Sequence, residues 1–486
     1  MNEIAKPALS RFGVSLPLLV GLVVFAATLG WASHLLRDPD IYLHVAVGRW
    51  IIAHHAVPHH DLFSYSMPGA PWVAHEWLAE VVMAVLRDGL GWAGLVVMAA
   101  FCFAAAAGLL QRALMNYLAP DHALIGTAMA VGLCFPHLLA RPHAFSLPFM
   151  VAWVAMLVAG AARGRDPPLL GCLLITAWAN LHSGYIIGLV IAALFAGEAV
   201  LDAADPRGAM RAARDWAIFG VLAVLASLVT PNGIAGLKLP FDLIRMDFGL
   251  SFIAEWQSPN FQHAHPLEPW LMLVLLGALS LGVRVPVTRI AVFFVLLHMA
   301  LQHQRLGEVL GLVAPLLFAP ALAPQVNRYP IPRFDHWLAG FAKRASIGGV
   351  ALAGITMLAL SAAVVRTGVE NDDGLYAPRA ALAAAAAHHV AGPVFNDINF
   401  GDYLIYSGAA APFIDGRIDM YGDAFLKRYA SVGEFPKLIA EYGMSWALLT
   451  PKNAHVPLLD NLPEWRRVYA DKDAVVYLRE TSPAPR

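Results

Sequence analysis

The sequence predicts an all-α polytopic membrane bundle of about eleven transmembrane helices, followed by a C-terminal extracytoplasmic α/β domain. Hydrophobic residues make up 59% of the chain and the mean hydropathy is +0.60, above the roughly 45–50% apolar content of soluble domains. Several apolar runs reach the ~20 residues needed to cross the hydrocarbon core. After residue 365 these runs give way to short β-type runs between helical stretches. The net charge of −1 gives no overall field that would attract nucleic acid.

Eleven apolar segments are expected to span the membrane, with boundaries good to a few residues. Lys6 and Arg11 precede the first of them and resemble the n-region of a signal peptide. The apolar run that follows is too long for a signal peptide, so we expect it to remain as a span. The segments lie at about residues 14–34, 92–111, 122–139, 145–162, 168–182, 184–202, 215–230, 268–283, 290–303, 306–323 and 346–365.

The distribution of basic residues predicts the orientation of the chain. With the N-terminus in the cytoplasm, the cytoplasmic loops hold 14 Lys and Arg residues, and the outer loops before residue 366 hold 7. Cytoplasmic loops carry an excess of Lys and Arg, so the count favours this orientation. An odd number of spans then places the C-terminal tail outside the cytoplasm.

The expected domains are a membrane domain, residues 1–365, and an α/β domain, residues 366–486. The membrane domain has two long outer loops, at 35–91 and 231–267. Alternating strands and helices in the tail predict a small α/β fold. The expected helices are 378–389, 424–429 and 434–442, and the expected strands are 393–395, 403–405, 412–414, 447–449 and 474–478.

Acids and histidines are crowded into the first outer loop, which makes it the candidate catalytic segment. Asp38, Asp40 and His44 follow the first span, and Glu76 lies near the loop's end with Glu80 one helical turn later. Helix capping accounts for one of the two aspartates, and a solvated helix edge accounts for the glutamates. Charged groups beside a bilayer are costly, however, which favours a polar site. A carboxylate there can act as a general base or hold a divalent cation.

Polar groups also mark the outer ends of several later spans. Arg141, His143, His182 and Arg305 fall at four such positions or next to them. Any one of them alone is explained by a turn with a side chain that snorkels toward water. Their agreement on one face favours a site for an anionic, lipid-linked phosphate.

Four further residues are candidates for binding an acceptor or another substrate. Glu255 lies in the second long loop, in the run Glu255-Trp256-Gln257-Ser258-Pro259-Asn260-Phe261. Asp397, Asp415 and Arg417 follow strand-like runs in the tail. Ordinary loop caps explain such acids equally well, although Asp415 and Arg417 would point to one side if the strand continued.

The layout resembles the GT-C superfamily of membrane glycosyltransferases, and within it a bacterial branch. The motifs that carry the resemblance are Asp38–His44, His75-Glu76-Trp77, Arg141-Pro142-His143, the Glu255–Phe261 run and Phe413-Ile414-Asp415-Gly416-Arg417. The resemblance implies an inverting transfer of a sugar from a polyprenyl-phosphate or polyprenyl-diphosphate donor to an envelope glycan, lipid or protein. It implies a multi-pass protein of the bacterial inner membrane, with a periplasmic C-terminal domain, acting at the outer face.

The resemblance also implies roles for individual residues. Asp40 or Asp38 would be the base that activates the acceptor, and Arg141 or Arg305 would stabilise the departing phosphate. Some members of the superfamily use a divalent cation, Mg²⁺ or Mn²⁺, and others do not. Gly401-Asp402-Tyr403 loosely resembles the aromatic-acid-glycine motifs of oligosaccharyltransferases.

Two alternatives from other classes stay open on the sequence. A transporter or flippase of a lipid-linked glycan would carry charged groups at mid-bilayer depth and internal repeats. The sequence shows no repeat, and most polar groups fall at the outer ends of spans. A non-catalytic scaffold for polysaccharide assembly would keep the same layout without activity.

Overall fold

The computed structural model describes residues 10, 13–165, 167–251, 253–329, 337–371 and 374–480. The chain packs into two compact units, each described by itself. The helical unit comprises Met1–Ala32, Ala93–Gly233 and Ile253–Gly368, and the α/β unit comprises Ser33–Trp92, Ile234–Phe252 and Val369–Arg486. The basic residues expected in an n-region, Lys6 and Arg11, lie outside the described residues.

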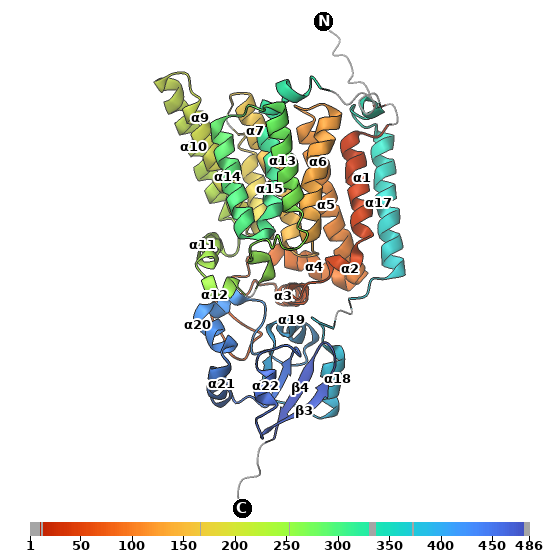
Figure 1. Cartoon of the computed structure of the whole chain (residues 1–486), viewed down its shortest axis with the longest axis vertical. Coiled ribbons are helices and arrows are strands. Elements are labelled where there is room, and N and C mark those ends of the chain that lie inside the picture. Colours follow the sequence, from red (N-terminus) through yellow and green to blue (C-terminus); the bar gives the residue numbers. More distant parts are fainter. Residues whose placement is uncertain are drawn as a thin grey trace, which may run out of the picture. The chain divides into compact units, whose positions relative to one another are not determined.

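Each of the eleven expected spans coincides with a helix of the helical unit (Figure 1). Among the described residues, α5, α7, the α15 segment and α17 are long and apolar enough to cross a membrane by length and composition. Eleven as the number of spans stays a prediction, because the other helices are shorter or more polar. The helices are α1 (Leu16–Leu29), α5 (Trp92–Leu114), α6 (Pro120–Cys134), α7 (His143–Ala162), α8 (Gly171–Leu181), α9 (Tyr185–Leu201), α10 (Pro206–Ser227), α13 (Leu267–Leu281), α14 (Val287–Gln302), α15 (Gly307–Val326) and α17 (Ile347–Thr367).

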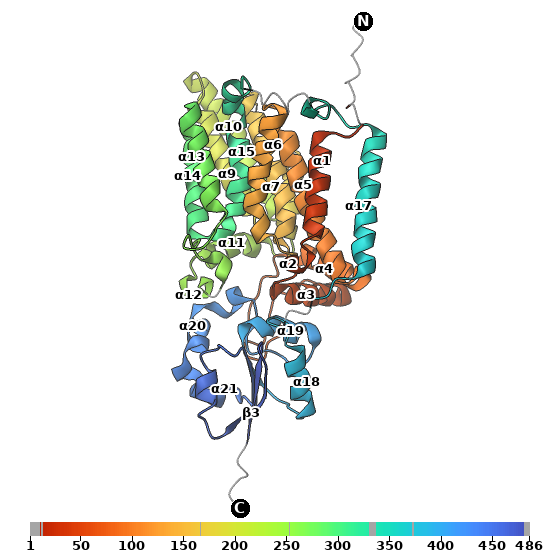
Figure 2. The ribbon, with the colours of Figure 1, turned by 45° about the vertical axis from the view of Figure 1, so that its right-hand side comes forward.

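Small residues and buried polar contacts hold these helices together. Gly108 of α5 lies so close to α1 that a Cβ there would be 3.1 Å from the Pro17 carbonyl oxygen, the close approach that small residues allow between membrane helices. α17 packs along α1 (Figure 2). Arg289 of α14 pairs with Glu198 of α9 at 2.9 Å and donates to the Leu317 carbonyl of α15. These contacts hold together helices that are distant in the sequence.

The α/β unit is built on a four-stranded sheet in the order β1-β2-β4-β3. β1 pairs parallel with β2, and the other two pairings are antiparallel. Phe400, Leu404, Trp446 and Val476 belong to its buried core. The elements are α3 (Asp40–His54), α4 (Trp77–Leu90), α11 (Gly233–Ile244), α12 (Asp247–Leu250), α18 (Arg379–Ala387), β1 (Val394–Asn396), α19 (Ile398–Ser407), α20 (Ile418–Ala430), α21 (Phe435–Tyr442), β2 (Trp446–Leu449), α22 (Val456–Leu459), β3 (Trp465–Ala470) and β4 (Val475–Arg479).

Three of the five expected strands are confirmed, and two are wrong. Residues 403–405 belong to α19, because Asp397 caps this helix and Gly408 ends it in the left-handed conformation. Residues 412–414 form no strand; the side chain of Asn396 accepts from the Phe413 N–H and donates to the Ile414 carbonyl. β3 was not expected, because its polar residues leave no apolar run.

Parts of the two long loops, 35–91 and 231–267, pack with the tail in the α/β unit. Tyr65 of the first loop donates to the Val394 carbonyl at 2.7 Å. Asp423 of α20 accepts from the N–H groups of Phe248 and Gly249 at the start of α12, at 3.1 and 2.8 Å. Three segments remote in sequence therefore build one folded body, which places the acids of the first loop beside those of the tail.

The helix pair α3–α4 fixes the acidic end of the first loop. Gly48 of α3 lies against the backbone of α4, where a Cβ would be 2.0 Å from the Glu80 carbonyl oxygen. Only glycine permits this approach without a backbone shift. On its other side α3 packs against α19, with the ring of Tyr42 edge-on to that of Tyr403 at 4.9 Å. α3 is thus held between α4 and α19.

Candidate active site

Asp40 and Asp402 meet at Gly416. Asp40 begins α3 and is half-buried, whereas Asp402 of α19 is completely buried. A Cβ on Gly416 would lie 2.7 Å from Asp402 Oδ2 and 3.0 Å from Asp40 Oδ1, so the missing side chain leaves the space in which the two carboxyl groups converge. The Gly416 N–H donates to Asp402 Oδ1 at 2.9 Å. Asp38 accepts from the Asp40 N–H at 3.0 Å, the helix-start role considered for one of the pair.

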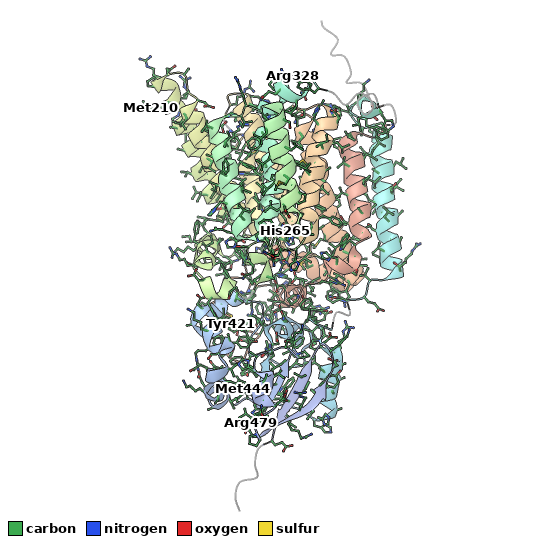
Figure 3. The ribbon with its side chains drawn as sticks, in the orientation of Figure 1. Met210, His265, Arg328, Tyr421, Met444 and Arg479 are labelled. Carbon is green, nitrogen blue, oxygen red and sulfur yellow. The ribbon has the colours of Figure 1, made fainter. Side chains whose placement is uncertain are left out.

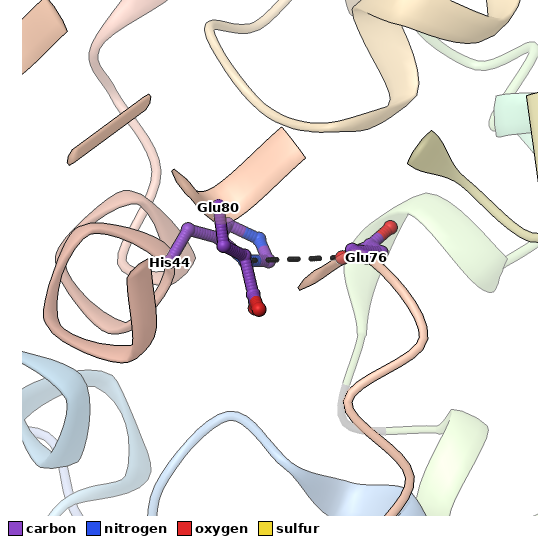
Figure 4. Close-up of side chains that lie close together, drawn as sticks. All are labelled: His44, Glu76 and Glu80. Carbon is purple, nitrogen blue, oxygen red and sulfur yellow. Dashed lines mark hydrogen bonds and ion pairs between the residues drawn. The ribbon is translucent and has the colours of Figure 1, made fainter. Parts of the chain in front are cut away.

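A second acidic group surrounds His44 (Figure 4). Its Nδ1 lies 3.2 Å from Glu80 Oε1 and 3.8 Å from Glu76 Oε2. One ligand atom from each of the three residues lies within 4.8 Å of the others. Glu80 Oε2 is buried without a hydrogen-bond partner among the described residues. Imidazole and two carboxylates at this spacing can hold a metal ion.

The neighbouring carboxylates affect the pKa of His44 more strongly than its burial does. Burial alone would lower the pKa of His44, but the hydrogen bond to Glu80 and the charges of Glu76, Glu80 and Asp40 raise it to about 9. Burial raises the pKa of Glu80, against the opposing influence of His44. His44 is therefore held as a cation at neutral pH when no metal occupies the group.

Arg417 and Asp415 form a buried ion-pair network with Asp61 of the first loop. Arg417 binds both oxygens of Asp415, at 2.8 and 2.6 Å, and its Nη1 lies 2.7 Å from Asp61 Oδ1. The Tyr421 hydroxyl donates to Asp415 at 2.8 Å, and the guanidinium stacks over the ring of Trp72 at 4.8 Å. Asp415 and Arg417, expected to bind a substrate, are thus engaged in joining the first loop to the tail.

Asp397 is likewise occupied by protein partners. It is buried, caps α19 through the Asn399 N–H, and accepts from Thr450 Oγ1 at 2.7 Å and Asn453 Nδ2 at 2.9 Å. The arrangement is the loop cap considered as its alternative role.

In the helical unit, Glu255 lies between two arginines. Its Oε2 is 2.5 Å from Arg141 Nη2 and 3.8 Å from Arg305 Nη1. Burial would raise the pKa of Glu255, but the charges of Arg141, Arg305 and His143 lower it to about 2. Figure 3 shows His265, which lies on the same segment as Glu255, at the end of the helices opposite Met210 and Arg328.

His182 extends this basic cluster. Trp178 Nε1 donates to Ser146 Oγ at 2.7 Å, which leaves the hydroxyl proton of Ser146 for His182 Nδ1 at 2.9 Å. The Gly184 N–H also donates to Nδ1, at 2.9 Å. The guanidinium of Arg305 lies on the other side of the ring, with its Nη2 3.4 Å from His182 Nε2. His182 therefore connects Ser146 of α7 to the guanidinium of Arg305.

His143 is placed differently from the other expected phosphate ligands. It is buried at the start of α7, with Nε2 3.7 Å from Glu308 Oε1 of α15. The structure thus brings Arg141, His182, Arg305 and Glu255 together and gives His143 its own carboxylate partner.

Sequence reasoning left out several residues that the structure places in these groups. Asp402 lay in the Gly401-Asp402-Tyr403 motif, directly before an expected strand, but it was not selected, because the sequence gave no indication of what its side chain faces. Asp61 lay among the histidines of the first loop. Ser146 and Glu308 lie inside apolar helices, where the sequence offered no pattern; a polar residue in an apolar run is itself the available indication.

The chain was compared with known proteins. The sequence matches no protein-family model and no curated protein. Among solved structures it is similar to the archaeal oligosaccharyltransferase AglB from Archaeoglobus fulgidus in complex with an inhibitory peptide and a dolichol-phosphate, with a TM-score of 0.56 and 12% identity over 96% of this chain and 75% of that one. It is also similar to apo ArnT from Cupriavidus metallidurans, with a TM-score of 0.51 and 14% identity over 95% and 97%.

A third similar structure is the apo oligosaccharyltransferase of Archaeoglobus fulgidus, with a TM-score of 0.55 and 11% identity over 89% and 69% of the two chains. At such identities the likeness concerns the fold. AglB and ArnT are GT-C glycosyltransferases, and the similarity extends over nearly the whole chain. The chain therefore has the GT-C fold of these structures, which is the fold that the resemblance implied.

Proposed function

We propose that this protein is a membrane glycosyltransferase. It moves a sugar from a polyprenyl-phosphate or polyprenyl-diphosphate donor to an envelope glycan, lipid or protein, at the outer face of the bacterial inner membrane and with inversion. The observation that carries the proposal is the half-buried carboxylate of Asp40 at the start of α3, in a chain with a GT-C fold. The dolichol-phosphate in the similar AglB structure supports a lipid-linked donor.

Asp40 is the general base in this proposal. It accepts the proton of the acceptor's nucleophile while that atom attacks the anomeric carbon and the bond to the donor phosphate breaks. A base of this kind must lie within hydrogen-bond reach of the nucleophile. The buried Asp402 behind it limits the directions in which its side chain can turn.

The basic cluster of the helical unit is proposed to bind the donor phosphate. Arg141 and Arg305 converge on the Glu255 carboxylate, and guanidinium groups that bind a carboxylate also bind phosphate oxygens. Glu255 therefore stands where a phosphate oxygen would. We assign it to this group rather than to an acceptor, as a counter-ion that a bound phosphate displaces or joins.

Binding of undecaprenyl phosphate to the purified full chain in detergent tests this assignment. Arg305→Gln is expected to weaken binding about tenfold, the effect of losing one charge-assisted hydrogen bond. Glu255→Gln is expected to strengthen binding, because it removes the competing carboxylate. Arg112→Gln, which removes an exposed charge from the last turn of α5, is the matched control. If Arg112→Gln weakened binding as much as Arg305→Gln, or if the wild type did not bind undecaprenyl phosphate, the proposed phosphate site would be wrong.

His44, Glu76 and Glu80 are proposed to hold a divalent cation. The partnerless, buried Oε2 of Glu80 fits this role, since a buried carboxylate oxygen without a donor is stabilised by a metal ion. Mg²⁺ and Mn²⁺ were the expected ions, and an imidazole ligand favours Mn²⁺ over Mg²⁺. When bound, the cation would neutralise negative charge next to the first turns of α3 and α4.

Mn²⁺ titration of the full chain, followed by electron paramagnetic resonance of the free ion, tests the metal site. Wild-type protein is expected to bind one Mn²⁺, and Glu80→Gln to weaken that binding at least tenfold by removing one of three ligands. Glu434→Gln, a change at a partly exposed acid, should leave it unaltered. Equal affinity in the wild type and Glu80→Gln would contradict the site.

A further inference from the structure

A completely buried carboxyl group lies directly behind the proposed base. Asp402 has no exposed surface. Its Oδ1 accepts from the Gly416 N–H, and its Oδ2 has no hydrogen-bond partner among the described residues. Asp402 Oδ2 and Asp40 Oδ1 both lie within about 3 Å of the point where a Cβ of Gly416 would stand. The orphaned oxygen is therefore on the side of Asp402 where the Asp40 carboxylate approaches.

Two glycines build this approach. Gly401 of α19 lies against the segment that carries Gly416, where a Cβ would be 2.0 Å from the Ile414 carbonyl oxygen. Gly416 in turn leaves room for Asp402. Side chains at these two positions would push α19 and the 414–416 segment apart, and the two carboxyl groups with them. Glycine at both positions lets α19 and the 414–416 segment pack closely, with both carboxyl groups next to Gly416.

The buried carboxyl group of Asp402 is not stable in its charged form beside the carboxylate of the half-buried Asp40, because burial and the neighbouring charge both oppose its ionisation. The titratable groups that face Asp402 are Asp40 on α3 and Asp415 and Arg417 beyond Gly416. Arg417 is already bound to Asp415 and Asp61. Burial first, and then the charges of Asp40 and Asp415, raise the pKa of Asp402 well above its ordinary value. A proton on Asp402 would neutralise its charge. Mg²⁺ is a less suitable counter-ion here, because it requires six oxygen ligands.

We propose that Asp402 is a positioning residue for Asp40: the two carboxyl groups share one proton, which stays on Asp402 and is donated in a hydrogen bond to Asp40. This inference rests on the proposed function for the role of Asp40. No covalent bond is made or broken in it. Asp402 fixes the rotamer of the base through this hydrogen bond, and in its neutral form it adds no negative charge beside the base.

The asparagine variant imitates the protonated state and supplies the test. In Asp402→Asn the amide oxygen can accept from the Gly416 N–H, and the amide N–H₂ can donate to Asp40. The wild-type folded state holds a proton that the unfolded chain releases above a pKa of about 4. Its stability therefore falls as pH rises through the window between the unfolded and the raised folded pKa. The stability of Asp402→Asn does not fall in this way as pH rises, because its side chain carries no titratable proton.

The experiment is thermal unfolding of the purified full chain, from pH 5 to pH 8, for wild type, Asp402→Asn, Asp40→Asn and the double variant. Asp402→Asn should gain Tm relative to wild type as pH rises. The gain should shrink in the Asp40→Asn background, because the neighbouring charge is gone. Asp402→Leu keeps the size without the donor, and it should lose Tm at every pH.

Three results would overturn the shared proton. One is an Asp402→Asn variant that is less stable than wild type throughout the pH range. Another is a pH-dependent gain in Tm from Asp402→Asn that is equally large in the wild-type and the Asp40→Asn background. A third is a Tm of the wild type that responds to MnCl₂ or EDTA when that of Asp402→Asn does not, because a cation would then join the pair. Loss of the proposed function is distinguishable: it would show as full transfer by Asp40→Asn, whatever the Tm values.

Discussion

Asp40→Asn is expected to abolish glycosyl transfer while the amount of folded protein stays unchanged. The amide keeps the shape of the side chain but cannot accept the acceptor's proton, and general-base catalysis contributes about 10²–10⁴-fold in rate. The amide oxygen of the variant can still accept a hydrogen bond from the buried Asp402, so the variant should fold to the same extent. The measurement is the envelope glycan made by cells that contain only the variant, beside immunoblots of the protein.

Asp88→Asn is the matched control for this prediction. It makes the same chemical change in the same unit, at an acid that is half exposed and pairs with Arg49. Such surface pairs contribute little to stability, and Asp88 belongs to neither acidic group. Wild-type glycan in Asp88→Asn cells and none in Asp40→Asn cells would support the assignment, and glycan in both would exclude Asp40 as the base.

Arg417→Leu is expected to destabilise the α/β unit by about 3–5 kcal/mol, the cost of removing one partner from a buried ion pair. The change leaves Asp415 and Asp61 buried with uncompensated charge. It also removes the cation that lies over the ring of Trp72. Because Asp61 belongs to the first loop, the loss should release that loop from the tail. Limited proteolysis of the full chain should then cut first between residues 59 and 72.

Arg466→Leu is the comparison for Arg417→Leu. Arg466 pairs with Glu480 at 2.6 Å, but more than half of each side chain is exposed. Its replacement should change the free energy of unfolding by no more than about 0.5 kcal/mol. If the two variants were equally stable, the network around Arg417 would not be what joins the first loop to the tail.

Periodicity and composition were sufficient for the apolar helices and for the division of the tail into strands and helices. They did not predict the elements whose structure depends on individual side-chain hydrogen bonds. Tyr403-Leu404-Ile405 is too short to distinguish strand from helix, and the cap supplied by Asp397 settled it. The backbone of Phe413 and Ile414 forms hydrogen bonds with the side chain of Asn396 and not with a neighbouring strand. β3 shows how a strand with polar residues on its exposed face escapes a search for apolar runs.

The candidate site was predictable as a set of residue types and not as a set of contacts. Asp40 and His44 were found because acids beside an apolar segment are uncommon. The partners of Asp415 and Arg417 were not, since a buried ion pair between residue 417 and residue 61 leaves no trace in local spacing. Asp402 was missed for the same reason: its importance comes from Gly416, which removes a side chain and so brings Asp40 near.

Reconstitution tests the central claim most directly. Proteoliposomes would contain the purified full chain, the lipids of cells that lack it, and their envelope fraction as acceptor. Mass spectrometry would follow the polyprenyl-linked sugars. Wild-type protein is predicted to consume one of them, with the appearance of the free polyprenyl phosphate or diphosphate and a glycosylated acceptor, and Asp40→Asn to consume none. If the wild type left every polyprenyl-linked sugar unchanged in amount, as a flippase or scaffold would, the protein would not be a glycosyltransferase.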